Sequence, residues 1–121
     1  MKKFVLHLED SSDEKLHSAL RMLHNFDIQA HTEDYHAVLL ITGQAVKHFT
    51  TDAPEHDEIL SLLTNRKISV KLCRNALSHQ QISEKDISDD FAVVPAGIYE
   101  LVSLQNNGYA YIKCRITTAI F

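Results

Sequence analysis

Short, mostly apolar runs alternate along the chain with longer stretches whose apolar positions recur at helical spacing. The runs lie at Phe4–Leu8, Ala37–Ile41, Ile68–Leu72, Ala92–Val94 and Tyr109–Cys114. In the second run the aliphatic residues are consecutive, which is typical of a parallel strand covered on both faces. The pattern therefore predicts five strands.

The stretches between these runs predict helices that begin near residues 12, 51, 74 and 98. The first carries Asp13 and Glu14 in its first turn, where the helix dipole favours negative charge. The second has Pro54 in its first turn, a position that tolerates proline. Ser83 predicts a further short turn through Glu84 to Ile87, because a serine side chain can cap a helix start.

Strands that alternate with helices predict an α/β fold in three layers, a mainly parallel five-stranded sheet flanked by helices on both faces. The 121 residues, 45% of them hydrophobic, suit a single domain over residues 1–121. The apolar segment 115–121 follows the last predicted strand. We expect it to pack on its own domain or on a neighbouring subunit.

Charge and apolar run length exclude several classes of protein. Twelve Lys and Arg face 16 Asp and Glu, so the net charge is −4 and a nucleic-acid partner is not expected. The longest apolar run, Ala37–Ile41, is far shorter than the roughly 20 residues that span a bilayer, so no membrane segment is expected. Two cysteines without CxxC spacing indicate neither a disulfide framework nor a zinc site, and they favour a reducing cytoplasm.

The candidate chemistry lies where strands lead into helices. In open parallel sheets, ligands bind beyond the carboxyl ends of the strands. Four such junctions occur, at residues 9–12, 42–44, 73–75 and 95–97, and we expect them along one edge of the sheet. Cys73 is the strongly nucleophilic side chain among them.

A cysteine at this position has two interpretations. Amide groups at a helix N-terminus, together with basic neighbours, can lower a cysteine pKa from about 8.5 to between roughly 3.5 and 7.5, and Arg74 adds a cation beside Cys73. Such a thiolate could attack a disulfide or a persulfide and carry the sulfur. Alternatively, Cys73 is a small buried hydrophobic residue at the end of a strand. Its position alone leaves both interpretations open.

Three further residues could support a site at the junctions. The Asn75 amide could cap the helix or bind a ligand. Gly43 and Gly97 each follow a strand, where glycine permits a sharp turn or the close approach of a ligand. Neither glycine belongs to a GxGxxG or Walker pattern, so no cofactor is predicted.

Eight histidines show no HxH or HExxH spacing, so no metal site is predicted. His48 could approach the junctions through the Gly43 loop, whereas His79 lies about two helical turns beyond Cys73. We expect solvated or structural roles for all eight. Cys114 is likewise interpreted as structural.

Two segments resemble a known family. "CRNAL", beginning at Cys73, resembles the C-x-N-[ST]-L element of the DsrE/DsrF-like family, and "VVPAGIYELVSLQNNGYAYIK" resembles its C-terminal pattern of strand, Pro-x-Gly, helix and final strand. The resemblance implies a three-layer α/β fold, trimers or hexamers, and sulfur relay through a cysteine persulfide. Cys73 matches the family cysteine. Ala76 stands where the family usually has Thr or Ser, so a hydroxyl that could cap the helix or bind a group is missing.

The leading hypothesis is therefore a sulfurtransferase-like sulfur carrier that forms a persulfide on Cys73 and exchanges sulfur with a donor or acceptor protein. Self-association into a homotrimer or homohexamer is expected from the resemblance. Two alternatives stay open: a non-catalytic binding or assembly module, and a redox sensor that uses the same thiol through sulfenic acid or a mixed disulfide. Whether the protein is an enzyme is left open as well.

Overall fold

Residues 1–114 are described by the computed structural model, and they contain one five-stranded sheet. The strands are β1 (Lys2–Leu8), β2 (Tyr35–Ile41), β3 (Ile68–Cys73), β4 (Ala92–Val94) and β5 (Ala110–Lys113). Every neighbouring pair is parallel, in the order β4-β3-β2-β1-β5. The predicted α/β fold with a parallel sheet is confirmed. The prediction for residues 115–121 lies outside the described residues.

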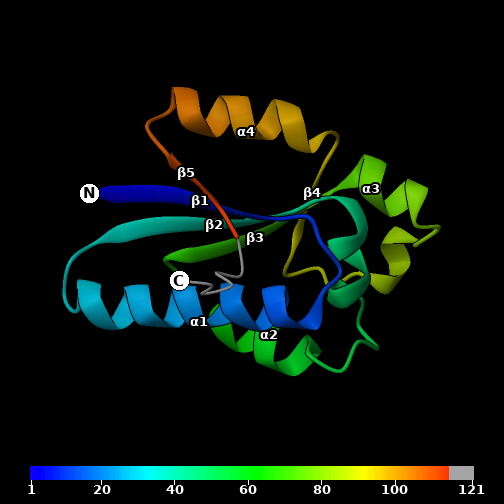
Figure 1. The fold of residues 1–121 in the computed structure, drawn as a ribbon, viewed down its shortest axis with the longest axis horizontal. Coiled ribbons are helices and arrows are strands. Elements are labelled where there is room, and N and C mark those ends of the chain that lie inside the picture. The colour runs from blue at the N-terminus through cyan, green and yellow to red at the C-terminus, as the bar shows by residue number, and fades with distance from the viewer. Residues whose placement is uncertain (115–121) are drawn as a thin grey trace, which may run out of the picture.

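Helices cover both faces of the sheet. They are α1 (Asp13–Ala30), α2 (His56–Leu62), α3 (Arg74–His79) and α4 (Gly97–Asn106), with 3-10 segments η1 (Gly43–Phe49) and η2 (Glu84–Asp86). In Figure 1, α1 and α2 lie below the sheet, α4 lies above it, and α3 stands beside the end where β3 finishes. The molecule therefore has the three expected layers.

The larger core lies between the sheet and α1. Alternate strand residues point to the same face, so Phe4, Leu6 and Leu8 of β1 all pack on this side. From α1, the fully or almost fully buried side chains are Leu16, Ala19, Leu20 and Leu23. Each buried leucine stabilises the fold by about 1.5–3 kcal/mol, so this face contributes most of the packing that fixes the strands.

The core under α4 is smaller and leaves room for polar side chains. Its buried residues are Val5, Val38, Leu40 and Leu104. The same sheet face also carries His7 and His36, which follow from the alternation along β1 and β2. The candidate site described below lies on this face.

The second helix begins later than the sequence predicts. The expected start at residue 51 or 52 is wrong: α2 begins at His56, and Pro54 precedes it. Successive turns replace the first helical turn, with Ala53 N–H donating to the Thr50 carbonyl at 3.1 Å and His56 N–H donating to the Ala53 carbonyl at 3.1 Å. Within residues 1–114, none of the helices combines the length and apolar character needed to cross a bilayer.

Candidate functional site

A cleft of about 330 Å³ lies beyond the carboxyl ends of the strands. Residues from all four strand-to-helix junctions line it: His7, Glu9, Thr42, Cys73, Asn75, Ala96, Gly97, Ile98 and Leu101. The junctions meet there because all strands are parallel and finish at one edge. Polar groups line one side, and Ile98 and Leu101 of α4 form an apolar wall.

Cys73 ends β3 and is the N-cap residue of α3. Its side chain is 7% exposed and borders the cleft. The Gly97 N–H, the first amide of α4, donates to the Cys73 Sγ at 3.3 Å. This donor and the positive end of the α4 dipole interact more strongly with a thiolate than with a thiol.

The helix that faces the sulfur differs from the one expected. The sequence pointed to the amides of α3, which begins directly after Cys73. Among the described residues, no side chain accepts a capping hydrogen bond from α3. The sulfur is directed instead toward the start of α4, where its donor Gly97 lies 24 residues after Cys73 in the chain.

Gly97 permits this close approach. A Cβ added there would lie 2.5 Å from Thr42 Cγ2, and 3.6 and 3.7 Å from Cys73 Cβ and Sγ. Thr42 and Cys73 therefore contact the same small region of α4 from the ends of two neighbouring strands. A larger residue at position 97 would separate these walls of the cleft.

The other expected supporting residues lie at different places. Asn75 lines the cleft and is exposed. Arg74 points to Glu84, with Nε donating to Oε2 at 2.8 Å and Nη2 to Oε1 at 3.4 Å. Gly43 begins η1 with φ at +55°, and a Cβ there would lie 2.8 Å from the Glu9 carbonyl oxygen. Gly43 therefore shapes the turn after β2.

His7 is a cleft residue that the sequence did not single out. It is 7% exposed, and within residues 1–114 it is the one polar side chain that is buried. Its Nε2 lies 2.7 Å from Thr42 Oγ1, and its Nδ1 lies 2.8 Å from the Tyr111 hydroxyl. Burial lowers the His7 pKa, Glu9 opposes this shift, and Lys113 adds to it. A neutral imidazole is therefore favoured.

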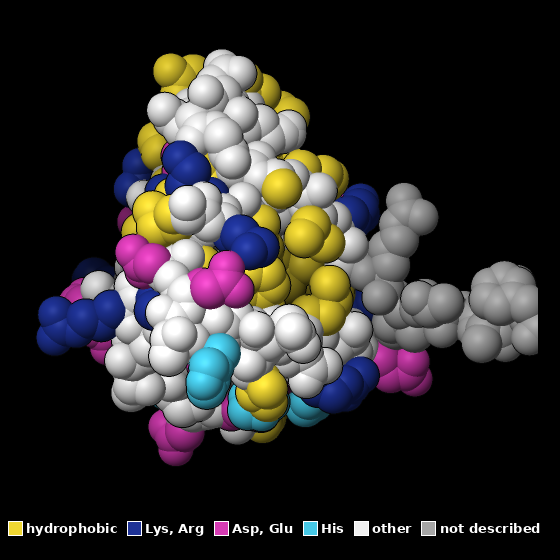
Figure 2. Space-filling view, turned by 90° about the vertical axis from the view of Figure 1, so that its left-hand side faces the viewer, with side chains coloured by type: hydrophobic (Ala, Val, Ile, Leu, Met, Phe, Trp, Pro, Cys, Tyr) yellow, Lys and Arg dark blue, Asp and Glu magenta, His cyan; other side chains and the backbone are white. Residues whose placement is uncertain are grey.

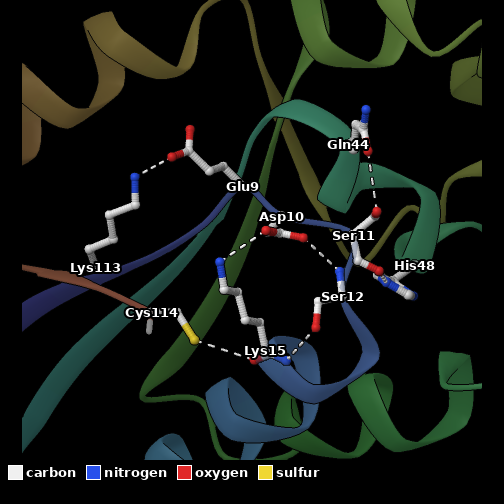
Figure 3. Close-up of polar contacts among 9 residues, drawn as sticks. All are labelled: Glu9, Asp10, Ser11, Ser12, Lys15, Gln44, His48, Lys113 and Cys114. Carbon is white, nitrogen blue, oxygen red and sulfur yellow. Dashed lines mark hydrogen bonds and ion pairs between the residues drawn. The ribbon is translucent and has the colours of Figure 1, made fainter. Parts of the chain in front are cut away.

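A charged pair stands beside His7 at the end of β1. The Lys113 ammonium donates to the Glu9 carboxylate, as Figure 3 shows. This hydrogen bond is the main cause of a lowered Glu9 pKa. Glu9 thus remains a carboxylate on the cleft lining at neutral pH.

The second cysteine lies on the other side of the sheet. Cys114 is 3% exposed and belongs to the core that contains α1. Its Sγ donates to the Lys15 carbonyl at 3.3 Å (Figure 3). Burial raises the Cys114 pKa, which disfavours a reactive thiolate.

One group of possible metal ligands comes together from three separate elements. Ligand atoms of Asp13, His48 and Glu55 lie within 4.8 Å of one another. His48 Nε2 donates to the Ser11 carbonyl at 2.6 Å, and Nδ1 lies 3.2 Å from Glu55 Oε1. Sequence spacing could not reveal this group, because Asp13 lies 35 residues before His48 and the fold brings them together. The hydrogen bonds already connect η1 to the starts of α1 and α2.

Comparisons with known proteins agree with the fold. The DsrE/DsrF-like family matches residues 3–114. A protein of unknown function from Methanobacterium thermoautotrophicum, MTH1491, has 20% identity and a TM-score of 0.82 over 93% of this chain and 99% of that one. The E. coli ychN protein has 21% identity and a TM-score of 0.71, and the match covers 93% of this chain and 99% of that one. BT1422 from Bacteroides thetaiotaomicron has 16% identity and a TM-score of 0.72, and the match covers 93% of this chain and 94% of that one. No curated protein matches the chain.

Proposed function

Because the chain belongs to the DsrE/DsrF-like family, we propose that it is a sulfur-relay protein whose Cys73 carries a sulfur atom as a persulfide. The observation that carries the proposal is the position of the Cys73 sulfur. It borders a cleft at the carboxyl edge of the sheet and accepts the Gly97 N–H at 3.3 Å. A reducing cytoplasm is the proposed location, because both cysteines are free thiols.

The cleft suits an exchange between thiols. The Cys73 thiolate attacks the outer sulfur of a donor persulfide, the bond between the two donor sulfurs breaks, and the donor leaves as a thiol after taking up a proton. In release, an acceptor thiol repeats this attack on the outer sulfur carried by Cys73. Each step moves one sulfur between thiols and needs no external oxidant. Ile98 and Leu101 supply the apolar surface on one side of the cleft.

Intact mass spectrometry tests this function directly. The reduced protein is incubated with inorganic polysulfide, desalted and weighed, and we expect a gain of about 32 Da for one added sulfur. Cys73→Ser should lose the gain. Cys114→Ser is the matched control, because its thiol is buried against α1, where it donates to the Lys15 carbonyl, and does not line the cleft; this variant should keep the gain. Subsequent addition of a small thiol should remove the added mass.

Two results would reject the proposal. One is a wild-type mass that stays unchanged after polysulfide treatment. The other is a mass gain that survives in Cys73→Ser and disappears in Cys114→Ser, since the sulfur would then be on the buried thiol.

An exposed apolar surface supports a second candidate function, assembly with further copies of this chain. The exposed apolar residues on α4 are Ile98 (73%), Tyr99 (75%) and Val102 (51%). In Figure 2, hydrophobic side chains gather over α4 at the top of the molecule. Surfaces of this kind usually mark interaction sites. We propose that a second copy covers them in a homotrimer or homohexamer.

Light scattering tests the assembly. Tyr99→Glu combined with Val102→Glu should convert the wild-type oligomer into monomers, because two charges would be buried at the contact. Ile28→Glu is the matched control: Ile28 is 62% exposed on α1, and its replacement should leave the oligomer intact. A monomeric wild-type protein would contradict the proposal.

A further inference from the structure

Moving sulfur between thiols also moves a proton. An attacking thiol must lose its proton, and the leaving sulfur must take one up. Side chains that line the cleft can provide a path for that proton. The following inference concerns this path and rests on the proposed function of Cys73.

Three side chains form a continuous hydrogen-bonded chain from the cleft to the edge of the sheet. Thr42 lines the cleft and contacts the same region of α4 as Cys73. Its Oγ1 lies 2.7 Å from His7 Nε2, and His7 Nδ1 lies 2.8 Å from the Tyr111 hydroxyl. Tyr111 stands on β5, the edge strand, and is 42% exposed.

The chemistry of these groups permits proton movement in either direction. A neutral imidazole has one N–H donor and one acceptor nitrogen, and each hydroxyl can donate or accept. When Thr42 gives a proton to His7 Nε2, His7 can release the other from Nδ1 to Tyr111. The ring then changes tautomer and gains no charge. The charged groups next to the ring are Glu9 and Lys113, which bind each other.

We propose that Thr42, His7 and Tyr111 form a proton relay that carries protons between the Cys73 cleft and solvent during thiol exchange. The leaving sulfur receives its proton by this route. Cys73 keeps the role of nucleophile. His7 acts through Thr42 and is a positioning and relay residue.

The same sheet face holds a chemically matched control. His36 on β2 has its Nδ1 2.5 Å from the Tyr109 hydroxyl and its Nε2 3.1 Å from Ser69 Oγ. This group also joins an imidazole to two hydroxyls. It lies near the amino end of β2, however, whereas the cleft lies beyond the carboxyl ends of the strands.

Two disulfide reagents separate proton delivery from nucleophilicity. Cys73 attacks either reagent, one sulfur–sulfur bond breaks, and the electron pair leaves on a thiolate. From 2-hydroxyethyl disulfide the leaving thiolate is basic and takes up a proton, which the relay delivers. From Ellman's reagent the aryl thiolate leaves without a proton. Rates are measured for the Cys114→Ser protein, so that Cys73 is the reacting thiol.

We expect His7→Gln to slow the reaction with hydroxyethyl disulfide by about 100-fold, the lower end of what proton transfer catalysis contributes. Its rate with Ellman's reagent should change less than about twofold. Tyr111→Phe, which removes a hydroxyl from a partly exposed side chain, should slow the first reaction in the same selective way. His36→Gln should leave both rates unchanged. With His7 in place, deuterium oxide should slow the reaction with hydroxyethyl disulfide more than the reaction with Ellman's reagent. This difference should disappear in His7→Gln.

Equal changes of both rates in His7→Gln and in Tyr111→Phe would overturn the relay, because a structural effect on the sulfur would explain them. Unchanged rates in both variants would overturn it too. The experiment needs no persulfide, so its outcome is independent of the polysulfide test. A missing mass gain would reject the proposed function, and a missing selectivity between the reagents would reject the relay.

Discussion

Replacing Gly97 by alanine tests the packing that brings Thr42, Cys73 and α4 together. The added Cβ would lie 2.5 Å from Thr42 Cγ2, whereas ordinary contact begins at 3.4 Å, so the two carbons would be 0.9 Å too close. Thr42 cannot rotate away freely, because its Oγ1 is bonded to His7 Nε2. Either this hydrogen bond breaks or α4 shifts.

The expected loss follows from two opposing effects. Overpacking of a dense region costs about 1–3 kcal/mol. Alanine in place of glycine in a helix stabilises by about 0.5–1 kcal/mol. The first effect is larger, so Gly97→Ala should reduce the free energy of unfolding by about 1–2 kcal/mol.

A second substitution isolates the clash. Thr42→Ser removes Cγ2 and keeps the hydroxyl that faces His7. In the Thr42→Ser background, Gly97→Ala should cost nothing or stabilise slightly, because only the helix effect remains. Urea unfolding of the four proteins gives the coupling between positions 42 and 97, which should be about 1–3 kcal/mol.

The double-mutant cycle can refute this reasoning in either of two ways. Gly97→Ala could prove as stable as the wild type with Thr42 in place. It could also cost the same amount in both backgrounds. In each case the Thr42 methyl would not be what requires glycine at position 97.

Three further predictions concern pH and backbone. Burial lowers the pKa of His7 and His36 in the folded protein, so below about pH 6.5 the unfolded chain binds more protons than the folded one. The urea midpoint should therefore be constant above about pH 7.5 and fall below about pH 6.5, with a smaller fall in His7→Gln. A midpoint that rises on acidification would contradict this. Burial and, to a smaller extent, the hydrogen bond to Asp27 raise the pKa of Tyr35 to about 12. Ultraviolet titration should show one tyrosine that ionises at higher pH than the others, and Tyr35→Phe should remove it. The free energy of unfolding should fall as the pH rises above about 10. Gly43→Ala should lower the free energy of unfolding by about 1–3 kcal/mol, because φ is +55° and the new Cβ would meet the Glu9 carbonyl at 2.8 Å; an unchanged urea midpoint would contradict it.

The strands were predictable because buried parallel strands are short aliphatic runs. The prediction at Ala92–Val94 coincides with β4, and β3 extends one residue past the predicted Leu72. The order of the strands in the sheet was not predicted, because it depends on where each strand–helix–strand connection places its second strand. The chain places its first strand next to its last, with β1 between β2 and β5.

The 3-10 segment η1 was missed for a physical reason. Its buried residues, Ala45, Val46 and Phe49, occupy one face, but three apolar positions are too few to show a period. Two features stabilise the segment: the positive φ of Gly43 at its start, and the packing of its apolar side chains on the core. Neither feature can be measured from a short window of sequence.

The sequence predicted that Cys73 lies at the carboxyl edge of the sheet, but it did not predict the hydrogen-bond partner of the sulfur. The donor on Gly97 depends on how α4 crosses the sheet. Arg74 faces Glu84, ten residues further on, because the α3–η2 loop folds back. His7 was passed over as one polar residue in an apolar run. A useful signal was available, since a polar side chain inside a buried strand needs hydrogen-bond partners.

The order of the strands has a consequence for how the protein is made at the ribosome. Residues 1–94 contain β1 to β4, which are consecutive neighbours in the sheet. The wall that carries Gly97 and the strand that carries Tyr111 emerge only afterwards. A nascent chain can therefore build most of its scaffold while the Cys73 thiol still lacks its amide donor, and the cleft around Cys73 is completed last.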